Sequence, residues 1–236
     1  SGSLVMLKNE RRALPLLASD GGRLVVTGEG ADDLGMQCGG WTLSWMGQRG
    51  NDFTCGTTVW RAVSRVAIGA SLVTPESALL GSSFGSWASS IVAPAPLLNA
   101  SCVLIVVGEG PYAEGGGDTR EARIKASDEA LIAQCADGKR KIIVLLICGR
   151  PLVIPQETMK KIDALVVGWL PGTEGDGIAD ILFGAVQLTG RLSYSWPRDG
   201  KQMTKESREG DNALFPIGHG LEYPVSALRE PLPEPA

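Results

Sequence analysis

Three short runs of the chain are apolar at every position, and they limit the fold more than any other feature. They cover residues 103–107, 142–147 and 164–167. Strands with one face in water alternate apolar and polar residues, whereas strands covered on both faces are apolar throughout. The runs therefore predict parallel strands buried between helices. Weaker runs complete a predicted set of six strands: residues 24–27, 71–74 and 190–196.

Segments with helical periodicity separate these runs. Residues 57–67, 126–135 and 174–183 carry apolar side chains at helical spacing, and residues 75–101 are expected to form a helix followed by a long connection. Alternating strands and helices indicate an α/β fold, in which a mostly parallel six-stranded sheet is sandwiched between helices.

The length of 236 residues suits one large domain. We expect this domain to span residues 1–224. Residues 225–236 contain three prolines and are expected to form a tail outside the core.

Charge and hydropathy exclude several classes of protein. The net charge is −4, whereas a nucleic-acid-binding domain needs a basic face. No run of 18 or more apolar residues predicts a membrane span, and residues 1–7 do not resemble a signal peptide. We therefore expect neither nucleic acid nor membrane as a partner.

Histidine and cysteine usage excludes further chemistry. The single histidine, His219, cannot form a His-rich metal site, and no G-x-S-x-G motif accompanies it to build a Ser-His-Asp triad. The five cysteines form no C-x-x-C pair, so a zinc site is not expected. A disulfide between Cys38 and Cys55 stays open on the sequence alone.

Ligands of parallel sheets bind outside the carboxyl ends of the strands, so the loops at that edge are the candidate sites. The loop after the strand at 103–107 contains Glu109, Glu114 and Asp118 among glycines. A carboxylic acid on a flexible loop suits a general acid that must reach a substrate atom. The alternative is an ordinary solvated acidic loop.

Two tryptophans, Trp41 and Trp45, lie in a polar, Gly-rich stretch after the first strand. Indole rings offer a large rigid surface on which sugar rings can stack. The alternative is that they are core aromatics that anchor the loop. We favour the core for Trp41 and ligand contact for Trp45, because Trp45 is followed by a loop.

Several segments together resemble the C-terminal α/β-sandwich domain of glycoside hydrolase family 3, in particular its β-glucosidases and exo-β-glucanases. They occur in family order from about residue 4 to residue 224. The matching pieces include Cys38-Gly39-Gly40-Trp41-Thr42 with Trp45, Val107-Gly108-Glu109 with Pro111-Tyr112 and Glu114, Gly149-Arg150-Pro151, Trp169-Leu170-Pro171-Gly172, Thr189-Gly190-Arg191-Leu192, and Phe215-Pro216-Ile217-Gly218.

The resemblance implies a retaining hydrolase of β-linked glucosides, whose active site needs two carboxylates. It assigns Glu114 as the catalytic acid/base. It places a tryptophan of the first loop at the aglycone-side sugar site, with Trp45 the better match and Trp41 the other candidate. Tyr112, two residues before Glu114, joins the substrate-binding candidates. Family members usually have Thr where this chain has Ala113.

The resemblance also implies that the nucleophile is an aspartate on an N-terminal (β/α)₈ barrel. Such a barrel alone takes about 250 residues, and this chain carries no matching motif. We therefore expect the chain to act with a barrel supplied in cis or in trans, on a β-glucoside or β-glucan oligosaccharide, and to hydrolyse little alone. The chemistry needs no metal or organic cofactor, and the resemblance favours a secreted or periplasmic location. The alternative is a non-catalytic glucan-binding or scaffold module with the same fold.

Overall fold

The structure is a computed structural model, and it describes residues 2–73, 97, 99–203 and 212–229. The helix expected at the start of 75–101 falls almost entirely outside the described residues. The predicted strands at 24–27, 71–74, 103–107, 142–147 and 164–167 are all confirmed, with ends that differ by at most two residues. The six strands are β1 (Val5–Asn9), β2 (Leu24–Thr27), β3 (Ser71–Val73), β4 (Cys102–Gly108), β5 (Lys141–Ile147) and β6 (Ala164–Trp169).

The strands form one sheet in the order β1-β6-β5-β4-β2-β3. All neighbours are parallel except β1, which runs antiparallel to β6 at one edge. The predicted α/β architecture with a mostly parallel sheet is therefore confirmed. The described helices are α1 (Leu34–Cys38), α2 (Val59–Val66), α5 (Ala126–Cys135), α6 (Gln156–Met159) and α7 (Gly175–Leu182), with 3₁₀ turns η1 (Ala18–Arg23), η2 (Glu114–Gly117), η3 (Gly200–Met203) and η4 (Val225–Ala227).

The strand predicted over residues 190–196 is wrong. This segment lies outside the sheet and pairs with residues 214–219, where Leu192 N donates to His219 O at 2.9 Å and Trp196 N donates to Phe215 O at 2.8 Å. Its burial is interrupted, since Ser193 and Tyr194 are exposed, while Trp196 is fully buried. The segment is therefore a cover over one face of the sheet, and the sixth strand is β1.

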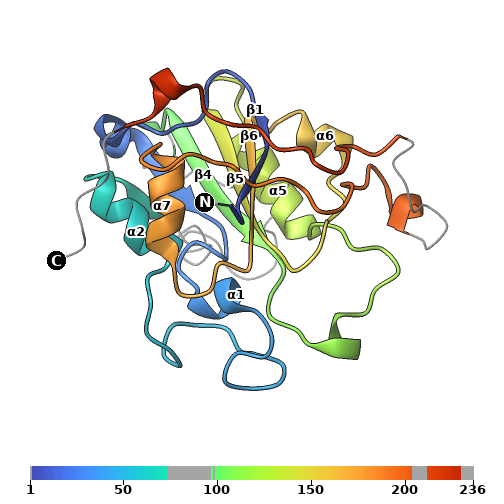
Figure 1. Cartoon of the computed structure of the whole chain (residues 1–236). Coiled ribbons are helices and arrows are strands. Elements are labelled where there is room, and N and C mark those ends of the chain that lie inside the picture. Colours follow the sequence, from blue (N-terminus) through green and yellow to red (C-terminus); the bar gives the residue numbers. More distant parts are fainter. Residues whose placement is uncertain (1, 74–96, 98, 204–211, 230–236) are drawn as a thin grey trace, which may run out of the picture.

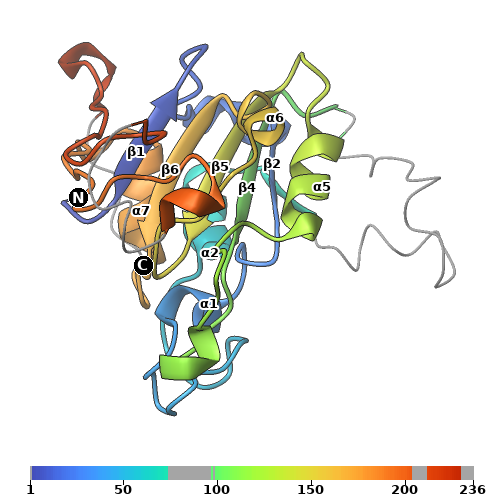
Figure 2. The ribbon, with the colours of Figure 1, turned by 90° about the vertical axis from the view of Figure 1, so that its right-hand side faces the viewer.

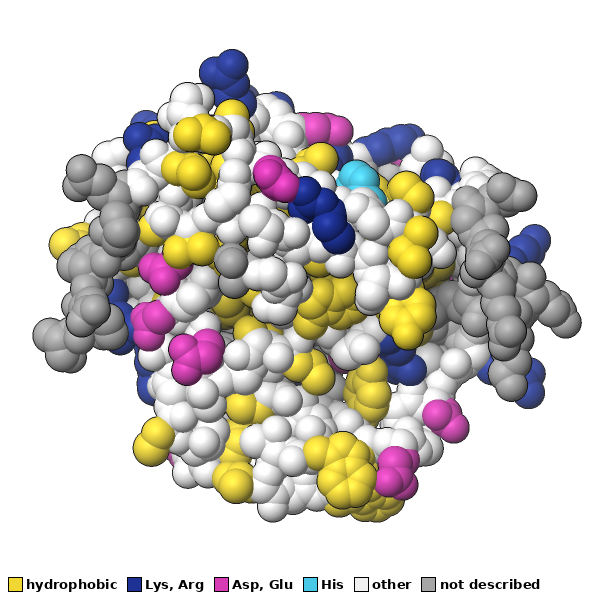
Figure 3. Space-filling view, viewed as in Figure 1, with side chains coloured by type: hydrophobic (Ala, Val, Ile, Leu, Met, Phe, Trp, Pro, Cys, Tyr) yellow, Lys and Arg dark blue, Asp and Glu magenta, His cyan; other side chains and the backbone are white. Residues whose placement is uncertain are grey.

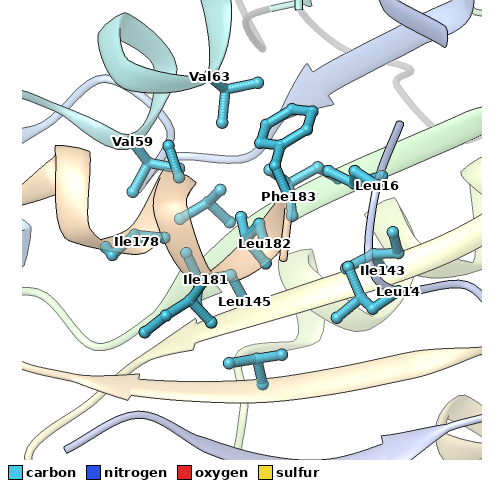
Figure 4. Close-up of a cluster of buried hydrophobic side chains, with 14 of the residues drawn as sticks. Leu14, Leu16, Val59, Val63, Ile143, Leu145, Ile178, Ile181, Leu182 and Phe183 are labelled. Atoms are coloured by element: carbon cyan, nitrogen blue, oxygen red, sulfur yellow. The ribbon is translucent and has the colours of Figure 1, made fainter. Parts of the chain in front are cut away.

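Helices cover both faces of the sheet (Figures 1 and 2). On one face, α2 and α7 pack against alternate residues of β4 and β5, such as Leu104 and Leu145. Figure 4 shows this cluster, in which α7 points Ile178, Ile181 and Leu182 toward the strands. On the other face, α5 and α6 pack against the intervening residues, such as Ile105 and Leu146. This two-sided burial explains why β4 and residues 142–147 of β5 carry no charged side chain.

Two features concern the ends and surface of the fold. Residues 225–229 continue along the body of the domain, where Arg229 N donates to Gly184 O at 2.9 Å. No helix in the described ranges is both long and apolar enough to cross a membrane.

Candidate active site

Two long loops leave neighbouring strands at the carboxyl edge of the sheet and pack together. Residues 39–50 follow α1, and residues 109–118 follow β4, which lies next to β2. A Cβ atom built on Gly40 would lie 1.9 Å from the carbonyl oxygen of Tyr112, and one on Gly116 would lie 2.6 Å from Cε of Met46. Figures 1 and 2 show both loops at the same end of the molecule. The close approach needs glycine at position 40, because any side chain there would meet backbone.

Glu114 opens the 3₁₀ turn η2, and its side chain is exposed. Its φ of 46° lies in the left-handed region, which glutamate rarely adopts. The preceding Ala113 is only 3% exposed, and its carbonyl oxygen accepts from Gly116 N at 3.1 Å. The side chain of Ala113 is therefore buried, and the carboxylate of Glu114 is directed into solvent.

Trp41 and Trp45 stand at the tip of the first loop, with 68% and 53% of each residue exposed. The backbone N–H of Trp41 donates to Trp45 O at 3.0 Å and closes a short turn. Within it, Trp41 and Leu43 adopt positive φ values of 62° and 59°. The expectation that Trp41 is a core aromatic is therefore wrong, because this turn faces its side chains outward. Hydrophobic side chains gather at this lower end of the molecule in Figure 3.

The base of the first loop is fixed by Asp33, which caps α1. Its Oδ1 accepts from Met36 N at 2.8 Å and Gly50 N at 3.0 Å, and its Oδ2 accepts from Arg49 Nε at 2.8 Å. Arg49 also pairs with Glu29, which in turn pairs with Lys125 at the start of α5. Burial alone would raise the pKa of Glu29, but the two cations outweigh it and lower that pKa. The loop is thus tied to the segment that follows the acidic loop.

Tyr112 is half-buried, and its contacts lie within the protein. Its hydroxyl donates to Glu109 Oε2 at 3.1 Å, and the guanidinium of Arg150 lies 4.8 Å from the ring centroid. Burial and the charge of Glu109 raise the pKa of Tyr112 to about 12, so the phenol stays protonated at neutral pH. The hydroxyl is therefore engaged by Glu109, and direct substrate binding by Tyr112 stays a prediction.

Other candidate chemistry is not assembled in the described part of the chain. There, no group of three or more His, Cys, Asp or Glu side chains could hold a metal ion. All five cysteines are free thiols, which answers the open question of a bond between Cys38 and Cys55. His219 donates from Nε2 to Leu7 O at 2.9 Å and stacks on Phe215. Its contacts are those of a structural residue.

The sequence did not indicate the contacts that Arg150 makes with the acidic loop. Arg150 follows β5 and contacts Glu109, Tyr112 and the carbonyl oxygen of Gly117. The Gly149-Arg150-Pro151 motif was the only signal, and it gave no indication that Arg150 reaches the loop that carries Glu114.

Comparisons with known proteins give relatives that share this domain. The lysosomal beta glucosidase of Dictyostelium discoideum is 28% identical over 241 residues, covering 94% of this chain and 28% of the relative. The periplasmic beta-glucosidase of Salmonella typhimurium is 31% identical over 149 residues, covering 52% of this chain and 19% of the relative.

A solved structure agrees with these relatives. An exo-1,3/1,4-beta-glucanase from a Pseudoalteromonas species superposes with a TM-score of 0.73 and 31% identity, covering 98% of this chain and 28% of that one. The chain thus spans less than a third of the length of each of these relatives.

The family profile covers almost the whole described fold. Residues 4–223 match the "Glycosyl hydrolase family 3 C-terminal domain". The resemblance inferred from the scattered motifs is therefore confirmed: this chain belongs to glycosyl hydrolase family 3 and carries its C-terminal domain.

Proposed function

We propose that this chain is the domain of a retaining β-glucosidase or exo-β-glucanase that supplies the catalytic acid/base, Glu114, and an aromatic sugar-binding loop. One observation carries the proposal: the loop with the exposed indoles of Trp41 and Trp45 packs against the loop with the exposed carboxylate of Glu114. Two surfaces of this kind side by side suit a bound sugar whose glycosidic oxygen must be protonated.

Of the two glutamates in the acidic loop, Glu114 is the one that is free to react. Glu109 has both oxygens engaged, one by Arg150 and the other by Tyr112. A general acid must come within hydrogen-bond reach of the atom it protonates, so an exposed carboxylate on a turn is suited to this role. The resemblance of the surrounding motifs to family 3 supports the same assignment, because it carries the family's acid/base over to Glu114.

The nucleophile comes from a partner domain in this proposal. Retaining glycosidases place two carboxylates about 5–5.5 Å apart, one as nucleophile and one as acid/base. We assign the nucleophile to an aspartate of a (β/α)₈ barrel, in cis or in trans. The lengths of the relatives leave room for such a domain, since this chain spans 28% of the Dictyostelium relative.

The reaction follows from these positions. Glu114 donates its proton to the glycosidic oxygen while the nucleophile's oxygen bonds to the anomeric carbon and the bond to the leaving sugar breaks. The resulting Glu114 carboxylate then takes a proton from water, whose oxygen displaces the nucleophile. Trp45 stacks on the leaving sugar and holds it during the first step. The β-glucoside or β-glucan oligosaccharide is thus the proposed substrate.

Glu114→Gln tests the proposal, because glutamine keeps the shape and loses the proton. In the full protein that carries this chain, we expect kcat/KM for methyl β-glucoside, a poor leaving group, to fall by roughly 10²–10⁴-fold. Dinitrophenyl β-glucoside leaves without protonation, so its kcat/KM should stay within about threefold. A loss of less than about threefold with the poor leaving group excludes Glu114 as the acid.

A non-catalytic glucan-binding module is the second candidate. The exposure of Trp41 and Trp45 favours it, because indoles can bind sugars without any catalytic group. The two functions differ in one measurement. If glucan binding depends on Trp45 while Glu114→Gln changes no hydrolysis rate, the chain is a binding module.

A further inference from the structure

We propose that Arg150 is a positioning residue that holds Glu114 in place by clamping the loop on both sides of it. This inference rests on the proposed function. Arg150 does not belong to the acidic loop; it follows β5, the neighbouring strand. Its guanidinium binds Glu109 before Glu114 and Gly117 after it, so the acid-bearing turn is held at both ends from a rigid strand end.

The clamp uses all three guanidinium nitrogens of Arg150. Nε and Nη2 both donate to Oε1 of Glu109, at 3.0 and 2.7 Å, and Nη1 donates to the carbonyl oxygen of Gly117 at 2.6 Å. The planar fork of arginine can serve both partners at once, whereas the ammonium of lysine acts as a single point charge. Arg150 therefore fixes the spacing between the start and end of the loop.

Tyr112 fills the space between the two arms of the clamp. Its ring lies under the guanidinium, and its hydroxyl donates a hydrogen bond to Oε2, the second carboxylate oxygen of Glu109. A Cβ on Gly117 would lie 2.2 Å from Cδ2 of the same ring, so the end of the turn sits directly against it. The segments immediately before and after Glu114 therefore rest on one packed unit of Glu109, Tyr112 and Arg150.

The ion pair between Arg150 and Glu109 is partly buried, which strengthens its hydrogen bonds. The side chains of Arg150 and Glu109 are 29% and 16% exposed. The remaining exposure of Arg150 faces an open hollow of about 440 Å³ that it lines with Asp118, Thr119 and Arg120. Hydrogen bonds to charged groups in such partly buried places are among the stronger ones in proteins.

The loop needs an external holder because its own sequence supplies little rigidity. Glu114 is followed by Gly115, Gly116 and Gly117, and glycine has more backbone freedom to lose than any other residue. Backbone hydrogen bonds at the two ends of the turn join Gly116 N to Ala113 O at 3.1 Å and Asp118 N to Gly115 O at 3.2 Å. Without Arg150, Glu114 would remain present but would sample many positions.

Kinetics with two leaving groups test the clamp in the full protein that carries this chain. A displacement of about 1 Å in a catalytic group can cost about 100-fold in rate. We expect Arg150→Gln to lower kcat/KM for methyl β-glucoside by roughly 10–100-fold and that for dinitrophenyl β-glucoside by less than about threefold. Arg150→Lys keeps the charge near Glu109 but loses the fork. Its kcat/KM for methyl β-glucoside should lie between those of the unchanged protein and Arg150→Gln. A purely structural role would lower kcat/KM for both substrates by the same factor.

Hydrogen exchange of the same protein, followed by mass spectrometry, gives a readout that does not depend on catalysis. We expect Arg150→Gln to accelerate exchange in residues 112–118 by roughly tenfold or more and to leave β5 unchanged. Arg11→Gln is the matched control. Arg11 also binds one carboxylate, Asp163, and backbone carbonyls, those of Lys139 and Arg140, at the amino ends of the strands. This control should change neither exchange in residues 112–118 nor the leaving-group dependence.

The outcomes separate the inference from the function beneath it. Unchanged exchange in residues 112–118, or equal losses with both substrates, overturns the clamp while Glu114→Gln still shows its leaving-group dependence. If Glu114→Gln shows no such dependence, the proposed function fails first and the positioning role falls with it. If Arg150→Gln does not fold, Glu109→Gln removes the charge from the other side of the pair and must reproduce the same selective loss.

Discussion

The backbone N–H of Trp41 donates a hydrogen bond to the carbonyl oxygen of Trp45 over 3.0 Å, and the turn that this bond closes leaves both indoles exposed. Large apolar rings held in water are costly unless something covers them, so exposed pairs of this kind mark binding surfaces. The bond fixes the backbone from which the two indoles project, and a fixed backbone would reduce the ordering required by the proposed sugar binding.

We expect Trp45→Ala to raise KM for β-glucan oligosaccharides roughly tenfold, because the leaving sugar loses its stacking surface. The effect on kcat should be small, and the measurement is steady-state kinetics of the full protein that carries this chain, on oligosaccharides of increasing length. Tyr194→Ala is the control, since Tyr194 is 71% exposed but lies in the segment that pairs with residues 214–219. An unchanged KM would leave Trp45 without a role in binding.

Gly40→Ala should separate the two loops of the site. The new methyl group would lie 1.9 Å from the carbonyl oxygen of Tyr112, and backbone must move to admit it. We expect a loss of about 1–3 kcal/mol in the free energy of unfolding, measured by urea titration. Gly177→Ala is the control: apart from the chain neighbours and backbone of its own helix, nothing lies within 4 Å of the added carbon, and alanine favours helix α7. Equal stability of the two variants would contradict the close packing of the loops.

Asp33→Ala should destabilise the base of the first loop more than Asp33→Asn. Alanine removes the cap of α1 together with the acceptors for Gly50 and Arg49, and we expect it to cost about 2–4 kcal/mol. Asparagine keeps a capping oxygen and should cost about half as much. Thermal unfolding of the two variants measures the difference, and the prediction fails if asparagine is as damaging as alanine.

Asp128 gives the domain a pH-dependent weakness. This carboxyl group is 2% exposed, and its Oδ2 accepts no hydrogen bond from any residue in the described ranges. Burial is the main cause that raises its pKa to about 6, and the charge of Glu29 adds to it, although Lys125 opposes both. The folded protein therefore holds this proton to higher pH than the unfolded chain, so the group lowers stability as pH rises from about 4 to about 6.

Asp128→Asn should remove this weakness, because asparagine stays neutral at every pH in the range. We expect the free energy of unfolding at pH 7 to rise by roughly 1–3 kcal/mol relative to the unchanged protein, and the gain to vanish near pH 4. Urea titrations of both proteins at the two pH values measure it. A gain of the same size at both values would show that packing, not ionisation, is the cause.

The parts of the fold that followed from the sequence are those in which local pattern and burial agree. The run at 142–147 is apolar throughout because β5 has neighbours on both sides and helices on both faces. Residues 190–196 misled because Leu192, Tyr194 and Trp196 alternate with serines as in a strand, although the segment pairs with the nearby chain at 214–219. β1 was missed because its apolar run, Leu4 to Leu7, gives way within the strand to the polar residues Lys8 and Asn9.

Candidate site residues could be named from the sequence where motifs surround them along the chain. Glu114 and Trp45 were proposed because family motifs surround them, and their exposure is what the structure adds. The exposure of Trp41 was not found, since it depends on a turn closed by a backbone bond that no side-chain pattern encodes. The clamp was not found because Arg150 and Glu109 meet only when β4 and β5 lie side by side in register.

The left-handed backbone at Trp41, Leu43 and Glu114 has a consequence for any attempt to improve this domain. Each of these residues holds a conformation that costs about 1–2 kcal/mol and that glycine would adopt without strain. Glycine would relieve this strain, although the freedom that it adds to the unfolded chain offsets roughly 0.5–1 kcal/mol of the gain. Any stabilising glycine at these three positions would delete an indole, an exposed apolar contact or the proposed acid. On this edge of the sheet, thermostability and the proposed sugar chemistry therefore favour different residues.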